Sequence, residues 1–405
     1  MSIRVHTVTK HKRAVRSSNL KDSLLAFVFH KQINFLGSAL FGLFLPIFLF
    51  EFFGYRVWAV LLYGAAYYFG AFVAEPLGAK LMTKIGLKKA MAFGVLLYVG
   101  FFASLLLKDI LPLWLVAGSS LSFLIAWHVV YWVPFHTAFA ESAPRNKLGS
   151  TVGFLNASCS AINIAVPIIS AWLIVSFGYP VLLISAGLII LLSILPIFFL
   201  SVEKEKFEFG FWQTFKILFS KKERSLLILY AAEGAENAIG FLVWPIFIFL
   251  LFKGKYLEVG AVATAVVFFS VILQIFVGRL SDRFNPQKIF HLGTGLTFFG
   301  WLLRIFVSSV GQVFFVGVFY SLAAILMNTP FEAIMYARAA DAGHYVDEYT
   351  VLREMALGVG RFLILLLSAL LVSFIGFPAA FLLAALAVVI FGAAVRLPNR
   401  SDLSV

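Results

Sequence analysis

The sequence contains little cysteine and little charge. Its single cysteine, Cys159, has no partner for an intrachain disulfide or a cysteine metal site, so we expect it to serve as a small packing residue. Charged residues make up 13% of the 405 residues, hydrophobic residues make up 62%, and the mean hydropathy is +0.98. So little polar surface cannot cover a water-soluble globule of this size, which indicates an integral membrane protein.

The long apolar runs lack the period-two alternation of outer-membrane barrels. Runs such as 181–200 and 379–395 also exceed ordinary strands, so helices are the economical way to satisfy their backbones in hydrocarbon. A membrane-spanning helix needs about 20 mostly apolar residues. The sequence therefore predicts an all-α membrane protein with twelve transmembrane helices, at 26–50, 57–79, 90–107, 112–138, 149–174, 180–200, 225–252, 258–279, 289–309, 311–337, 350–375 and 378–396.

A short motif recurs at about half of the chain length. Residues 46–50, Pro-Ile-Phe-Leu-Phe, return 199 residues later as Pro-Ile-Phe-Ile-Phe at 245–249. Two further pairs keep nearly this spacing, namely Pro134-Phe135 with Pro330-Phe331 and Gly178-Tyr179-Pro180 with Gly376-Phe377-Pro378. We therefore expect two pseudo-symmetric six-helix bundles that meet at a seam, which is where secondary transporters place their substrate. The expected parts are a basic tail at 1–25, the N-terminal bundle at 26–200, an interfacial linker at 201–224, the C-terminal bundle at 225–396 and a tail at 397–405.

Positive charge lies mostly on one side of the predicted helices. The net charge is +13, and 25 Lys and Arg residues lie on the side of both termini and the middle loop, against four on the other side. The positive-inside rule therefore predicts cytoplasmic termini and a cytoplasmic linker in a multi-pass protein of the plasma (inner) membrane. Because topology accounts for the basic charge, we expect no nucleic-acid partner.

The linker has the pattern of an amphipathic helix. Its apolar residues fall at helical spacing and its lysines lie opposite to them, which is typical of a helix lying in the headgroup region. A docking site for a partner is the alternative. The apolar residues are Phe211, Trp212, Phe215, Leu218 and Phe219, and the lysines are Lys216, Lys221 and Lys222.

The segment between the eighth and ninth predicted helices reads Gly-Arg-Leu-Ser-Asp-Arg at 278–283. It resembles the glycine-x-leucine-x-aspartate-arginine loop of the major facilitator superfamily, and the twelve spans, the cytoplasmic termini and the half-length repeat agree with this resemblance. A weaker first-half copy has Thr83 in place of the carboxylate. The resemblance implies the major facilitator fold and a cytoplasmic gating loop that includes Gly278, Asp282, Arg283, Lys84 and Gly86.

The same resemblance implies that the first and fourth helices of each half line a central cavity. The fourth helix carries His128, Tyr131, Trp132, Phe135 and His136 at i, i+3, i+4, i+7 and i+8, a stripe that could bind an aromatic or amphipathic solute. A helix-packing face with two satisfied histidines is the alternative reading. The other predicted cavity residues are Asn34 and Ser38 in the first helix, Asn237 and Trp244 in the seventh, and Asn328 and Phe331 in the tenth.

Acidic residues at membrane depth lie mostly in the second half. Glu233 and Glu236 are one turn apart in the seventh helix, and Glu332 is in the tenth. A carboxylate inside hydrocarbon should be paired, protonated or hydrated, so these residues are candidates for proton coupling or substrate contact. Arg361, at a similar depth, is the expected counter-charge of Glu236. The alternative is a fixed Glu–Arg pair whose only role is to hold the helices of the second half together. Two other charged residues at membrane depth, Glu75 and Arg304, are expected to be structural.

These patterns predict a secondary active transporter that moves a small organic solute by alternating access, driven by protons. A multidrug efflux antiporter is an alternative, although the fourth helix has no arginine and Ile162 and Val166 replace the glycines of the efflux motif in the fifth. A membrane-embedded enzyme or a non-transporting sensor is a further alternative, but nucleophile, zinc and phosphate-loop motifs are missing. We expect a monomer in the lipid bilayer that is not an enzyme and has no cofactor or metal. The sequence does not identify the solute.

Overall fold

Helices account for nearly all of the described chain. The computed structural model describes residues 17–142, 148–201, 207–281, 285–341 and 346–395, and these ranges contain no strand. The all-α prediction is confirmed. The helices are α1 (Ser17–Gly42), α2 (Leu45–Phe52), α3 (Val57–Ile85), α4 (Leu87–Leu106), α5 (Leu113–Ser142), α6 (Leu148–Asn163), α7 (Val166–Leu192), α8 (Ile194–Ile197), α9 (Phe211–Leu218), α10 (Arg224–Leu251), α11 (Tyr256–Ser281), α12 (Pro286–Arg304), α13 (Val310–Asp341), α14 (Val346–Ile375) and α15 (Phe377–Ala394), with a 3₁₀ turn at Leu107–Asp109.

Length and hydropathy alone identify ten membrane-spanning segments among the described residues, not the predicted twelve. One of the ten, Gly153–Ile197, covers the end of α6 and all of α7 and α8, and its non-helical residue Gly178, with φ +77°, divides it into two arms. Helix α12 is less apolar and lies at the predicted span 289–309. Once the bend at Gly178 and the lower hydropathy of α12 are taken into account, each of the twelve predicted spans overlaps a described helix or helical arm.

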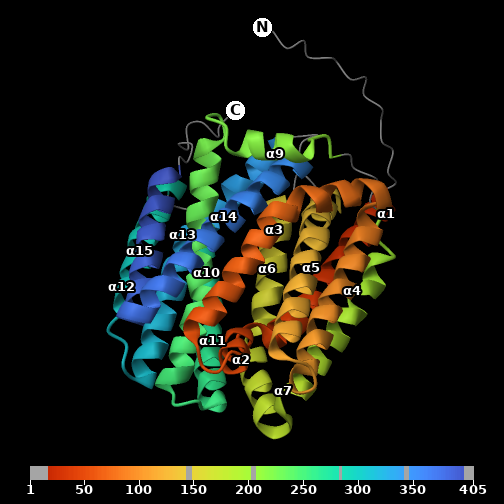
Figure 1. Ribbon diagram of the computed structural model, residues 1–405. Coiled ribbons are helices and arrows are strands. Elements are labelled where there is room, and N and C mark those ends of the chain that lie inside the picture. Colours follow the sequence, from red (N-terminus) through yellow and green to blue (C-terminus); the bar gives the residue numbers. More distant parts are fainter. Residues whose placement is uncertain (1–16, 143–147, 202–206, 282–284, 342–345, 396–405) are drawn as a thin grey trace.

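The helices form two groups that lie side by side (Figure 1). The first half, α1–α8, occupies one side of the molecule and the second half, α10–α15, occupies the other. The halves meet where α3 packs on α14 and α7 packs on α11. We call the end that holds α9 and the start of α1 the terminal end, and the end that holds α2 the far end (Figure 1).

The sequence repeat reappears as repeated turns. Gly178 and Gly376 both have positive φ, +77° and +90°, and each lies two residues before a proline that occupies the first turn of a helical arm. A second pair of turns exchanges the glycine: Gly54-Tyr55 and Lys253-Gly254 are all left-handed. The left-handed backbone of this turn therefore occurs in both halves, although glycine occupies the first position in one half and the second position in the other.

The two halves differ at the repeated proline motif. In the first half, Pro46 lies in the first turn of α2, which follows a break after α1 at Gly42. In the second half, Pro245 lies inside the continuous helix α10. Proline removes a backbone donor and disturbs the preceding turn, so it permits a break or a kink, and the surrounding packing decides between them.

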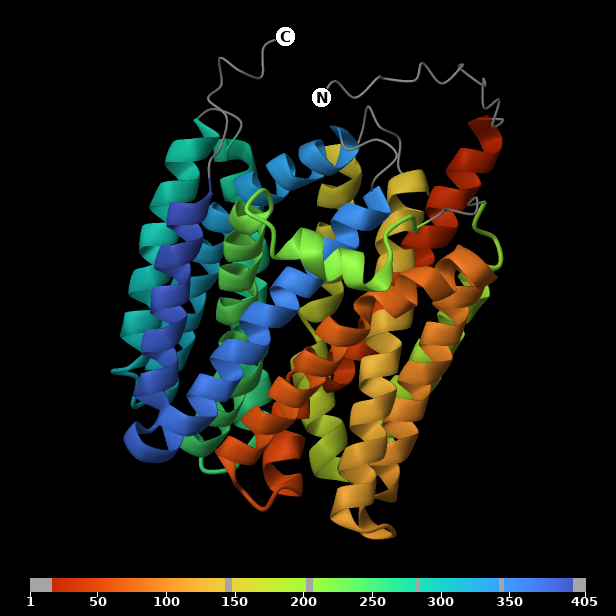
Figure 2. The same cartoon turned by 45° about the horizontal axis from the view of Figure 1, so that its top comes forward.

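The linker is attached to both halves at the terminal end. Helix α9 crosses α3 and α14 (Figure 2), and its Phe215 ring packs against Phe72 of α3 with centroids 5.4 Å apart. Before α9, the Phe207 N–H donates to Thr83 Oγ1 of α3 at 3.1 Å, and the Glu208 N–H donates to Glu348 Oε1 of α14 at 3.0 Å. The predicted amphipathic helix is therefore present, but it is shorter than the linker.

Candidate functional site

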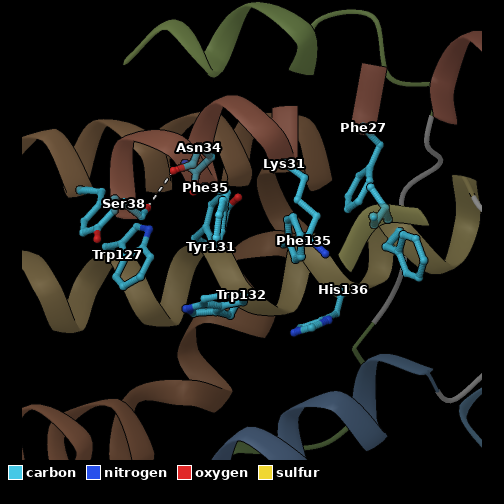
Figure 3. A pocket seen from close by; sticks show the side chains of 13 residues that line it. Phe27, Lys31, Asn34, Phe35, Ser38, Trp127, Tyr131, Trp132, Phe135 and His136 are labelled. Carbon is cyan, nitrogen blue, oxygen red and sulfur yellow. Dashed lines mark hydrogen bonds between the residues drawn. The ribbon is translucent and has the colours of Figure 1, made fainter. Parts of the chain in front are cut away.

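Helix α5 carries the predicted aromatic stripe along a cavity in the first half. The cavity has a volume of about 290 Å³, and α1, α4, α5 and α6 line it. Figure 3 shows Trp132 and His136 projecting from α5 toward a helix of the second half. The lining residues are Phe27, Lys31, Asn34, Phe35, Ser38, Tyr98, Trp127, Tyr131, Trp132, Phe135, His136, Phe139 and Leu155.

Part of the stripe is also a packing face, as the alternative reading of the sequence suggested. Tyr131 is buried, and its hydroxyl is 2.8 Å from Nε2 of His30. Nδ1 of His30 lies 2.7 Å from the backbone oxygen of Ser193, so Nδ1 carries the proton and Nε2 accepts from Tyr131. Asn34 donates to Ser193 Oγ at 3.3 Å. These contacts tie α1, α5 and the turn before α8 together behind the cavity.

A second cavity lies in the second half. Its volume is about 200 Å³, and α10, α13 and α15 line it. The lining residues are Glu233, Glu236, Asn237, Met327, Asn328, Phe331, Val388 and Phe391. The structure therefore brings the predicted residues of the seventh and tenth spans together. The side chain of Glu332 lies outside the described residues, and Trp244 packs against Phe247 and Phe381 instead of lining this cavity.

Glu236 is held by partners from its own half. Trp301 of α12 donates its indole N–H to Glu236 Oε1 at 3.0 Å, and the Tyr320 hydroxyl of α13 donates to the same oxygen. The nearby Arg304 guanidinium lies 4.0 Å and 3.9 Å from the ring centroids of Trp301 and Tyr320. It also lies 4.4 Å from Trp244, and Arg304 is only 3% exposed.

The expected pairing of Glu236 with Arg361 is therefore wrong, because Arg304 is the arginine that lies near Glu236. The Arg361 guanidinium lies 5.1 Å above the ring of Tyr68 in α3, across the seam. Counting residues along a helix gives the depth of a side chain but not the direction in which it points. Arg304 points into the second half, toward Trp244 of α10, whereas Arg361 points across the seam to Tyr68 of α3.

The seam contains a cluster of charged groups that the sequence prediction missed. We call Glu75 of α3, His128 of α5, and Glu354 and Arg361 of α14 the seam cluster. Nε2 of His128 lies 3.9 Å from Glu75 Oε2 and 3.9 Å from Glu354 Oε2. Arg361 is close enough to both carboxylates for electrostatic interaction. The seven-residue spacing of Glu354 and Arg361 on one helix face was the available sequence signal.

At the far end, hydrogen bonds join the two halves. The Tyr256 hydroxyl of α11 donates to Glu51 Oε1 of α2 and accepts from the Tyr179 hydroxyl of α7 at 3.2 Å. Deeper in the molecule, the Ile168 N–H of α7 donates to Thr264 Oγ1 of α11 at 3.2 Å. The far end is therefore closed by direct polar contacts in this conformation.

The predicted gating loop is only partly described. Asp282 and Arg283 lie outside the described residues, and Gly278 lies in α11 where its surroundings are not described. In the first-half copy, Lys84 lies in the last turn of α3, and Gly86 follows with φ +85°. The gating role of these residues stays a prediction.

Replacing Tyr256 by Phe is expected to weaken far-end closure, because it removes the hydrogen bond to Glu51. A hydrogen bond contributes about 0.5 to 1.5 kcal/mol, so the far-end-open population should rise about two- to tenfold. The measurement is the labelling rate of a cysteine introduced at Ser38 in a Cys159→Ser background, with an impermeant maleimide on the far side. Tyr55→Phe, at an exposed far-end tyrosine, is the control. Equal labelling of both variants would contradict the gate.

The same gate should respond to pH. Burial raises the pKa of Glu51 above its ordinary value of 4.5, although the Tyr256 hydrogen bond and the charge of Lys108 act in the opposite direction. The closed gate thus binds a proton more tightly than an open, hydrated gate. Acid therefore favours closure, and this contribution is lost as the pH rises through the raised pKa. Labelling at Ser38→Cys, divided by the rate of the same cysteine in the unfolded protein at each pH, should slow on acidification, and Glu51→Gln should remove that trend.

Comparisons with known proteins agree with this architecture. The family model described as Major Facilitator Superfamily matches residues 32–252 and 226–404. An uncharacterized protein, YqgE of Bacillus subtilis (strain 168), is 27% identical over 326 residues, which are 75% of this chain and 73% of that protein. The crystal structure of the human organic anion transporter MFSD10 (TETRAN) is similar with a TM-score of 0.68 at 13% identity, covering 93% of this chain and 99% of that chain. At that identity the structural likeness shows the fold alone.

Proposed function

Since the chain belongs to the major facilitator superfamily and is thus a secondary transporter rather than an enzyme, we propose that it moves an amphipathic organic solute by alternating access, coupled to protons. We further propose that the terminal end faces the cytoplasm, because the basic residues gather on the side of the termini and linker. The far-end contacts then close the outer side, so the conformation described here is closed to the outside.

The observation that carries this proposal is the pair of cavities, one in each half. The first is lined by α1 and α5 and the second by α10 and α13, which are the repeat-related first and fourth spans of the two bundles. Secondary transporters bind their solute between such repeats, near mid-membrane. Rocking of one half against the other would expose both walls to one side of the membrane at a time.

The first cavity suggests the chemistry of the solute. Aromatic rings dominate its wall, Lys31 and His136 are its basic groups, and the described residues that line it include no carboxylate. Such a wall suits an aromatic or amphipathic molecule with an acidic group, through stacking on Trp132 and charge at Lys31. The human relative is titled an organic anion transporter, which makes organic anions the first class to test. Export of such compounds uses the same cavity as uptake.

Counterflow in proteoliposomes tests the function. The purified protein is first screened by thermal shift against aromatic carboxylates, because a bound solute stabilises the folded state. Reconstituted protein should then exchange labelled solute for unlabelled solute without a gradient. Trp132→Ala is expected to raise the half-saturating concentration about tenfold, which corresponds to about 1.4 kcal/mol of lost contact.

The control is Trp172→Ala, because Trp172 lies on the exposed surface of α7. This variant should exchange like the unmodified protein. Lack of exchange for every compound that stabilises the unmodified protein would refute the transport proposal. Equal effects of the two tryptophan variants would refute the assignment of the first cavity.

A further inference from the structure

A proton-coupling group must change its surroundings when a transporter changes conformation, because only then does its proton affinity differ between the two states. Glu236 does not meet this condition well. Its partners, Trp301 and Tyr320, and the nearby Arg304 all belong to the second half. A half that rocks as a rigid body carries these partners with it.

The seam cluster meets the condition. Glu354 belongs to the second half, whereas His128 and Glu75 belong to the first, and His128 lies 3.9 Å from each carboxylate. A rocking movement at the contact of α3 with α14 would therefore change the distance between His128 and Glu354. The surroundings of the imidazole depend directly on how the halves are placed.

Other titratable groups face the cluster from each of its three helices. On α3, the Tyr67 hydroxyl is 2.7 Å from Nδ1 of His128, and the ring of Tyr68 lies under Arg361. On α5, Nε2 of His136 is 4.0 Å from Glu354 Oε1. On α14, Arg353 Nη1 is 2.9 Å from that same oxygen. Glu354 thus has a cation beside it, which favours its ionised form.

Arg361 acts on Glu75 through its charge, but among the described residues no Lys or Arg forms an ion pair with Glu75 as Arg353 does with Glu354. Glu75 is only 1% exposed, and within the described part of the chain its Oε1 accepts no hydrogen bond. Its Oε2 faces His128 at a distance too long for a direct hydrogen bond. An unsolvated carboxylate without hydrogen bonds has a high free energy in a low-dielectric interior, so the protonated form of Glu75 is favoured at this site.

We propose that Glu75, His128 and Glu354 form the proton-binding site of this transporter. One proton resides on either the Glu75 carboxyl or the His128 imidazole, which lie 3.9 Å apart, while Glu354 of the opposite half adds its negative charge beside them. When the halves separate at this point, Glu354 moves away from His128. The site then loses a nearby negative charge, its proton affinity falls, and the proton passes to water. This inference rests on the proposed proton-coupled transport, and it places the coupling at the seam instead of at Glu233 and Glu236, where the sequence predicted it.

The test compares accumulation of solute in proteoliposomes under an imposed pH gradient. Glu75→Gln and Glu354→Gln should each lower accumulation about tenfold or more, toward the equilibrium level. The variants must still show a thermal shift with solute, which proves that they are folded. Glu258→Gln changes an exposed far-end residue and should accumulate solute like the unmodified protein. Full accumulation by folded Glu75→Gln would overturn the proposal.

Failure of the proposed function gives a different result. If the unmodified protein exchanges solute but a pH gradient drives no accumulation, proton coupling itself is refuted, and with it the proton site. If Glu75→Gln does not fold, Tyr67→Phe replaces it, because this change removes only the hydroxyl at His128 Nδ1. The midpoint of the pH profile of accumulation should then shift by about half a pH unit or more. An unchanged midpoint would overturn the proposal.

Discussion

Replacing Gly360 by Ala is expected to destabilise the second half by about 1 to 3 kcal/mol or more. A Cβ atom at this position would lie 1.8 Å from the backbone oxygen of Ala231 and 2.5 Å from its carbonyl carbon. Main-chain atoms cannot turn aside as a side chain can, so α14 would have to move away from α10. The measurement is the free energy of unfolding in mixed detergent micelles.

The control lies in the same half. Gly295 of α12 has open space where its Cβ would be, so Gly295→Ala should change the free energy of unfolding by about 0.5 kcal/mol or less. Because Arg361 follows Gly360 directly, a displaced α14 should also disturb the seam cluster and reduce gradient-driven accumulation. Similar stabilities of the two alanine variants would contradict the close approach of α10 and α14.

Replacing Arg304 by Leu is expected to cost about 3 to 5 kcal/mol, the usual effect of removing a buried charge that offsets another. The change leaves Glu236 buried without its nearby positive charge, and it also removes the guanidinium from between the rings of Trp244, Trp301 and Tyr320. The measurement is again the free energy of unfolding in detergent.

The second variant separates charge from packing. In Arg304→Leu combined with Glu236→Gln, the unpaired charge is gone, so part of the lost stability should return. Arg56→Leu, at an exposed far-end arginine, is the control and should be nearly neutral. If the double variant is no more stable than Arg304→Leu, Arg304 stabilises the second half by packing between the aromatic rings rather than by its charge.

Local features of the chain were well predicted where lipid and backbone chemistry decide them. The helix bounds follow the apolar runs, since a backbone in hydrocarbon must satisfy its own hydrogen bonds. The repeated turns at Gly178 and Gly376 occur where the repeat of the Gly-x-Pro motif placed them. Of the predicted residues of the fourth span, Tyr131, Trp132, Phe135 and His136 do line a cavity, whereas His128 lies at the seam instead.

Charge partners were poorly predicted because they depend on helix rotation and on which helices are neighbours. Arg361 and Glu236 agree in depth, yet each finds its partners on a different side of the second half. Glu75 was taken as structural, although its neighbours on α5 and α14 make it part of a charged cluster. Each step along a helix turns the side chain by about 100°, so depth agreement alone does not bring two groups together.

The sequence by itself determined that this protein is a helical membrane protein built from two related halves, because hydropathy, periodicity and the half-length repeat are properties of the chain alone. Only the tertiary structure decided which charges meet. The packing of α3 and α5 against α14 places Glu354 beside His128, and the Trp301 indole of α12, which donates to Glu236 of α10 and stacks on Arg304, brings Arg304 near Glu236. The physical reason is that the rotation of each helix and the identity of its neighbours determine which charges lie close together in a membrane interior. The sequence alone specifies neither directly.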